Sequence, residues 1–67
     1  METQILKLKS LIINESKGIT LVCIEISKSI SGSIFYALKN VKTENIKIVR
    51  NNHIFEMLET GYAIKND

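Results

Sequence analysis

The fold is decided by the stretch Ile5-Leu-Lys-Leu-Lys-Ser-Leu-Ile-Ile-Asn-Glu-Ser-Lys-Gly-Ile-Thr-Leu-Val-Cys-Ile-Glu-Ile-Ser-Lys28. Two arms, residues 5–13 and 19–26, are rich in aliphatic and β-branched side chains, as strands are. The five polar residues between them, 14–18, end in a glycine, which reaches positive φ without strain. This pattern predicts one long β-hairpin.

The register of this hairpin follows from placing Ile13 opposite Ile19. Side chains alternate between the two sides of a strand, so the even-numbered residues share one face. These are Leu6, Leu8, Ser10, Ile12, Thr20, Val22, Ile24 and Ile26. A slip of one residue would bring Lys7 and Lys9 into this apolar set, so the even-numbered face is predicted to be the core.

The segment 34–41 admits two interpretations. As a strand, it places Ile34, Tyr36 and Leu38 on the even-numbered face, opposite Ile26, Ile24 and Val22 respectively. A five-residue loop, 41–45, would then lead to a returning strand, 46–50, with Leu38 opposite Ile48. As a helix, the chain would instead present an apolar stripe with lysines at its C-terminal end. The shared even-numbered pattern favours the strand.

A short helix is predicted after these strands. Asn51 and Asn52 are favourable N-caps, and apolar residues follow them at helical spacing. Gly61 suits the left-handed position that follows the last turn. Because two turns do not persist alone in water, we expect Phe55 and Leu58 to pack on the even-numbered face.

The predicted fold is therefore α+β, a four-stranded antiparallel β-meander with one short C-terminal helix on one face. It is expected to form a single domain over residues 1–67, with a core that includes Leu8, Ile24, Leu38, Phe55 and Leu58. The alternative is a ββαβα order with residues 30–42 helical.

Size and composition narrow the class of protein. A chain of 67 residues removes only about 60% of its unfolded surface from water, so such domains often need disulfides, a metal or oligomerisation. Cys23 is the single cysteine, and no Cys/His cluster offers metal ligands, which leaves oligomerisation. Nine basic against seven acidic residues are too small an excess to indicate nucleic acid or a membrane.

The sequence also indicates a compartment and a kind of source. Its start, Met-Glu-Thr-Gln, lacks the basic and apolar segments of a signal peptide, and its longest apolar run, 21–24, is far shorter than the ~20 residues of a membrane span. With one unpaired thiol, this favours a cytoplasmic protein. Twelve Ile, eight Lys and six Asn with one Arg and no Pro are the bias of AT-rich coding sequences, which include many phage genes.

Neither His53 nor Cys23 is predicted to be catalytic. His53 has no matched carboxylate or nucleophile in the sequence, and Cys23 lies within a strand as a small hydrophobic residue. The chain has no glycine-rich phosphate loop, nucleophile elbow, paired carboxylates at helical spacing or zinc spacing. We therefore expect no enzyme, no metal and no cofactor.

The odd-numbered face of the hairpin carries two candidate binding surfaces. The first is an apolar cluster near the loop, predicted to mediate self-association: Leu11, Ile13, Ile19 and Leu21. The alternative is that the C-terminal segment 62–64 folds over this cluster. The second is a lysine-rich surface around one aromatic ring, a possible nucleic-acid site: Lys7, Lys9, Phe35, Lys39 and Lys47.

These observations predict a non-enzymatic binding module that self-associates to a homo-oligomer and acts on a partner macromolecule, another protein. A small phage-type inhibitor of a host protein is the form we expect. One alternative is a nucleic-acid-binding protein that uses the lysine-rich surface. Another is a dimer that encloses a small ligand. No membrane partner is expected.

Overall fold

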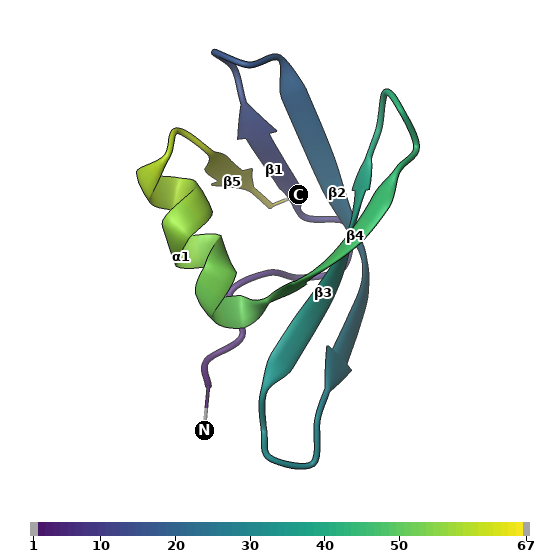
Figure 1. Cartoon of the computed structure of the whole chain (residues 1–67), viewed down its shortest axis with the longest axis vertical. Helices are drawn as coiled ribbons and strands as arrows, with labels where there is room; N and C mark the ends of the chain where they lie inside the picture. The colour runs from purple at the N-terminus through teal and green to yellow at the C-terminus, as the bar shows by residue number, and fades with distance from the viewer. Residues whose placement is uncertain (1, 67) are drawn as a thin grey trace.

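The computed structural model describes residues 2–66 and confirms the α+β class, with five antiparallel strands instead of four (Figure 1). The elements are β1 (Leu11–Asn14), β2 (Ile19–Lys28), β3 (Ile34–Asn40), β4 (Ile46–Arg50), α1 (Asn51–Glu59) and β5 (Ala63–Lys65). The strand order is β4-β3-β2-β1-β5, so β4 and β5 are the edges of the sheet. Because β3 is a strand, the helical alternative for residues 30–42 is wrong.

The first hairpin differs from the predicted one by one residue in register. Asn14 pairs with Ile19 across residues 15–18. The Asn14 side chain explains the difference, because its Oδ1 accepts hydrogen bonds from the Lys17 N–H (3.2 Å) and the Ser16 hydroxyl (2.8 Å). Asn14 is thus the last strand residue, and the shift moves Ile19 and Leu21 to the core side.

A β-bulge at Ile24 reverses the alternation halfway along β2. Cys23 lies opposite Leu38, but the next pair joins Glu25 and Ala37, so Ile24 is the extra residue. Odd-numbered residues face the core before the bulge, and even-numbered ones face it afterwards. The prediction that even-numbered residues face the core along the whole strand is therefore wrong.

Strand β3 keeps its predicted core face but has different partners. Its side chains Ile34, Tyr36 and Leu38 are buried, as predicted. Leu38 pairs with Lys47 on β4 instead of Ile48, and the loop between the two strands has the predicted five residues, 41–45. Because the register differs by one, Ile48 lies on the side of the sheet away from the core.

Residues 2–10 form no strand instead of the first half of a hairpin arm, although Lys9 and Ser10 still hydrogen-bond through their backbones to Cys23 on β2. A tight turn at Leu8 and Lys9 is closed by a hydrogen bond from the Ser10 N–H to the Lys7 carbonyl (3.1 Å), and Lys9 has a φ of +71°. Leu6 is fully buried beside the core, whereas Leu8 is 60% exposed. The predicted core position of Leu8 is therefore wrong.

The core lies between one side of the sheet, α1 and the segment 2–10 (Figure 1). Its buried members are Leu6, Ile12, Leu21, Cys23, Ile34, Tyr36, Leu38, Val49, Ile54 and Met57. Of the five predicted core residues, only Leu38 is buried. The other four are exposed because of the turn at Leu8, the bulge at Ile24 and the rotation of α1, which turns Phe55 and Leu58 outward.

A buried hydrogen-bond network joins β3, α1 and the N-terminal segment. The Tyr36 hydroxyl donates to Asn51 Oδ1 (2.5 Å) and accepts from the N–H groups of Ile5 (2.9 Å) and Leu6 (3.3 Å). Asn51 Nδ2 in turn donates to the Thr3 carbonyl (2.7 Å). Each polar side-chain atom of Tyr36 and Asn51 is thus paired, as buried polar groups must be.

This network sets the rotation of α1 about its axis. Asn51 is the first helical residue and is buried, so it is not the predicted N-cap; that position is Arg50, whose side chain makes no capping hydrogen bond. Ile54 and Met57 follow Asn51 at three-residue spacing and face the sheet with it. The predicted contacts of Phe55 and Leu58 with the sheet are therefore wrong.

The end of α1 is as predicted. Gly61 has a φ of +105°, and the Tyr62 N–H donates to the Met57 carbonyl (3.1 Å). This is the 6→1 hydrogen bond of a Schellman cap, in which glycine takes the left-handed position. The cap turns the chain back so that β5 pairs with β1.

Replacing Leu38 with alanine should lower the free energy of unfolding by about 2–5 kcal/mol, because a fully buried leucine leaves a cavity. Ile24→Ala should cost clearly less, since Ile24 lies at the bulge and is 43% exposed. Urea unfolding followed by circular dichroism measures both values. Equal losses for the two variants would contradict the bulge.

Tyr36→Phe should also destabilise the protein, because it removes the hydroxyl that joins Asn51 to Ile5 and Leu6. Each buried group left unpaired costs about 1–3 kcal/mol. Tyr62→Phe is the matched control, since Tyr62 is half-buried and its hydroxyl has no hydrogen-bond partner among residues 2–66. Urea midpoints that coincide for the parent and Tyr36→Phe would rule out a stabilising role of the network.

Candidate functional site

The side of the sheet opposite α1 carries exposed aliphatic side chains on β4. Ile46 and Ile48 are 56% and 65% exposed. Val49, the next residue along β4, points to the other side of the sheet and is buried in the core. The neighbours of Ile46 and Ile48 on β3 complete a surface that we call the outer face. It consists of Phe35, Ala37, Lys39, Ile46, Ile48 and Arg50.

The charged side chains of the outer face already have partners. The Arg50 guanidinium lies 5.7 Å from the centroid of the Phe35 ring, a cation–π contact. The Lys39 ammonium lies 3.8 Å from the Glu44 carboxylate. Since Ile48 pairs with Ala37 between these two charged groups, it forms the apolar centre of the outer face.

Strand β4 also exposes backbone hydrogen-bonding groups, because it is an edge of the sheet. The Asn40 N–H donates to the Asn45 carbonyl (2.8 Å), so these two residues form a hydrogen-bonded pair. Bonded and non-bonded pairs alternate along antiparallel strands. The backbone groups of residues 45, 47 and 49 therefore point toward β3, and those of Ile46 and Ile48 point toward the open edge.

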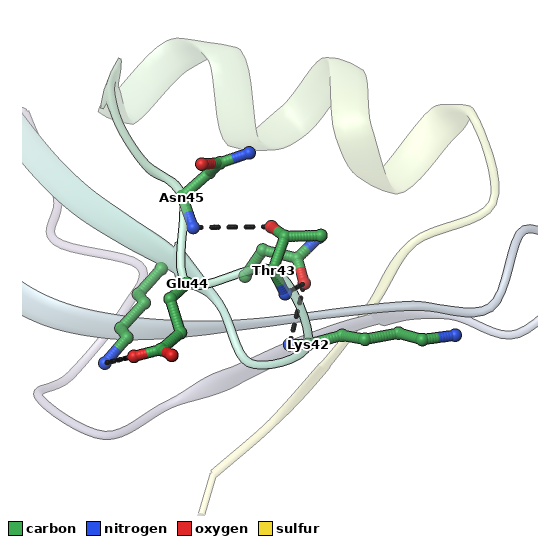
Figure 2. A network of polar contacts seen from close by, with 6 residues as sticks. Lys42, Thr43, Glu44 and Asn45 are labelled. Carbon is green, nitrogen blue, oxygen red and sulfur yellow. Dashed lines mark hydrogen bonds and ion pairs between the residues drawn. The ribbon is translucent and has the colours of Figure 1, made fainter.

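The loop that leads into β4 is held by its own hydrogen bonds (Figure 2). Asn40 Oδ1 accepts from the N–H groups of Lys42 (2.9 Å) and Thr43 (3.1 Å), and Thr43 Oγ1 accepts from the Asn45 N–H (3.3 Å). Glu44 takes a φ of +65° within this turn. The start of β4 is thus fixed relative to β3, which gives the exposed edge a defined geometry.

A cleft of about 300 Å³ lies on the core side of the sheet, between the loop 41–45 and Tyr62. Leu21 and Leu38 contribute to its apolar lining. Polar groups also line it, from Asn40, Thr43, Asn45 and Lys47. Its volume is at the lower end of the range for ligand sites, and the cleft is half open to solvent.

His53 has a hydrogen-bond partner that the sequence analysis did not identify. Its Nδ1 lies 2.9 Å from Glu56 Oε2, and both side chains are exposed on α1. Together with Lys47 they line a hollow of about 190 Å³ next to the cleft. The i, i+3 spacing was visible in the sequence. Such pairs stabilise helices weakly, and we assign this role to the pair.

Cys23 is fully buried, as predicted. Burial raises the pKa of the Cys23 thiol, and a hydrogen bond with the Glu25 backbone has a smaller opposing effect. Lys9 contacts Cys23 through its backbone, since its N–H donates to the Cys23 carbonyl (2.8 Å). A buried thiol with a raised pKa is poorly reactive.

The predicted self-association cluster is divided between the two sides of the sheet. Leu21 is buried and Ile19 packs against the core. Leu11 and Ile13 lie on the side of the sheet away from the core and are half-buried there. The prediction that these four residues share one surface is wrong, because it placed Ile13 opposite Ile19. In the structure Asn14 pairs with Ile19 instead. Self-association itself stays a prediction.

The predicted lysine-rich surface is also dispersed. Phe35 and Lys39 share the outer face. Lys47 lines the cleft on the other side of β4, and Lys7 and Lys9 belong to the N-terminal segment before β1. The prediction that these residues form one surface is therefore wrong, and nucleic-acid binding stays a prediction without this support.

Comparison with known proteins found no matching family model, no similar curated protein and no similar solved structure. Within residues 2–66, no group of three or more His, Cys, Asp or Glu side chains could hold a metal ion. In the same part of the chain, no helix is long and apolar enough to cross a membrane.

The stability of the parent should fall more steeply with pH than that of Cys23→Ala. Burial raises the pKa of the folded thiol, so the folded state holds this proton more tightly than the unfolded state. The resulting stabilisation is complete below the pKa of an exposed thiol, about 8.5, and is lost as the pH rises through the folded-state pKa. Urea titrations from about pH 7 to about pH 10 measure the difference, and parallel profiles for the two proteins would contradict it.

Proposed function

We propose that this chain is a small binding module that associates with a second copy of itself through β4 and the outer face. One observation carries the proposal: Ile46 and Ile48 are exposed on a strand whose backbone groups also point toward an open edge. An exposed edge strand offers a ready template for pairing with another chain. Both kinds of contact are thus available on the same strand.

The composition of β4 supports pairing. Its sequence Ile46-Lys-Ile-Val-Arg50 contains three β-branched residues and no proline, which would remove a backbone donor. Fully burying an isoleucine contributes on the order of 1.5–3 kcal/mol. Ile46 and Ile48 are more than half exposed, so a partner that covers them would gain a large part of this energy.

The size of the chain gives a second reason. A domain of 67 residues has a small core, and its net stability is typically only a few kcal/mol. Covering two further isoleucines would add an amount comparable with that stability. The expected role as an inhibitor of another protein stays a prediction beyond this self-association.

A small ligand enclosed by the dimer is a second candidate function. Ile46 and Lys47 belong to β4 and also line the cleft of about 300 Å³. A second copy that pairs with β4 would therefore lie beside the cleft. The lysine and the neighbouring amide groups would suit an anionic or hydrogen-bonding end of such a ligand.

The parent should form dimers at micromolar concentration, and Ile48→Lys should be a folded monomer. A lysine in place of Ile48 adds a charge at the apolar centre of the outer face but disturbs no core contact, because Ile48 is exposed. Light scattering gives the mass, and circular dichroism checks the fold. Leu8→Lys is the matched control, since Leu8 is similarly exposed but lies outside the sheet.

Two results would contradict the proposal. The first is a monomeric parent at micromolar concentration. The second is an equal loss of dimer in Ile48→Lys and Leu8→Lys, because a surface away from β4 would then mediate association.

A further inference from the structure

We infer that two copies of this chain join their β4 strands antiparallel, about a two-fold axis through Ile48, to form one continuous sheet. This inference rests on the proposed self-association and specifies its geometry. It follows from the direction of the backbone groups of β4, from the length of the strand and from the positions of its charges.

The direction of the backbone groups limits the possible registers. Pairing at the open edge requires outward-pointing N–H and C=O groups from both strands. On β4 these belong to Ile46 and Ile48, and the alternation continues to the N–H of Arg50. Only registers that place even-numbered residues opposite even-numbered residues can therefore form hydrogen bonds.

Strand length selects one of these registers. With Ile48 on the axis, all five residues of β4 lie opposite residues of the second β4, with Ile46 opposite Arg50. With Val49 on the axis, Ile46 would lie opposite position 52, which belongs to α1. Helical residues cannot extend a sheet, so that register loses pairs.

The charge of Lys47 disfavours the register in which Lys47 lies on the two-fold axis. With Lys47 on the axis, its side chain would lie directly opposite the same lysine of the second copy, and like charges in this position are destabilising. With Ile48 on the axis, Lys47 lies opposite Val49 of the second copy instead. The charge of Lys47 thus favours the register with Ile48 on the axis, in which the two β4 strands also overlap over their whole length.

The resulting interface has both backbone and side-chain contacts. The Ile48 N–H of each copy would donate to the Ile48 carbonyl of the other, and each Arg50 N–H to an Ile46 carbonyl. The two Ile48 side chains would lie side by side on the shared outer face. The methylene groups of each Arg50 would cover Ile46 of the second copy while its guanidinium stays in water.

Single-cysteine cross-linking tests this register. In a hydrogen-bonded antiparallel pair the Cα atoms are about 5.5 Å apart, within the range of about 4.4–6.8 Å that a disulfide spans. Ile48→Cys should therefore form a covalent dimer under mild oxidation. The native Cys23 is buried in both copies, so the parent should give no such product.

Ile46→Cys is the matched control, because Ile46 is similarly exposed on the same face of the same strand. In the inferred register the two copies of position 46 lie four residues apart along the strands, about 13 Å, which is beyond disulfide reach. Lys47→Cys is a second control and would cross-link efficiently only in the neighbouring register. The double variant Ile46→Cys with Arg50→Cys should cross-link, and it tests the same register should Ile48→Cys fail to fold.

The expected result is at least a tenfold faster cross-linking of Ile48→Cys than of Ile46→Cys or Lys47→Cys in a dimeric parent background. If the parent is a dimer but either control cross-links as fast as Ile48→Cys, the inferred register is overturned while self-association stands. If light scattering shows a monomeric parent, the proposed self-association fails and this inference fails with it.

Discussion

The hydrogen bonds of the buried Tyr36 hydroxyl determine where α1 and the N-terminal segment pack. The hydroxyl makes three hydrogen bonds, to Asn51 at the start of α1 and to the backbone of Ile5 and Leu6. Because an unpaired buried polar group is costly, these groups must be brought to β3. Both elements that could cover the sheet, α1 and the N-terminal segment, are therefore drawn to the same side, and the outer face of β3 and β4 stays open.

The class of fold, the helix, its glycine cap and the loop 41–45 were predictable because each depends on local signals. Helical spacing, a glycine placed after the last turn and a polar interval between apolar runs act over a few residues. The core face of β3 was predicted correctly because it was assigned from the even-numbered residues of β2, and these face the core after the bulge, where Ile26 pairs with Tyr36.

The register and the candidate site were not predictable, because they depend on single side chains that change the count of residues. Asn14 accepts a hydrogen bond from the Lys17 N–H, which shortens the loop by one residue. Ile24 is the extra residue of the bulge in β2. Each event inverts the face of everything paired beyond it. The exposure of Ile48 was not predictable either, because the alternation of Ile46 and Ile48 with Lys47 favours the isoleucines on the core face.

The two edges of the sheet are unequal, and this has a consequence for how far assembly can proceed. The edge opposite β4 is β5, which has only three residues and ends at Lys65. A short edge strand is a common means of protecting a sheet edge, and β4 is longer, with five residues. In the proposed assembly, β4 is therefore the one edge of each chain that is available for pairing. A pair joined through β4, as we propose, would expose only its two β5 edges, so we expect growth to stop at two copies instead of continuing into a filament.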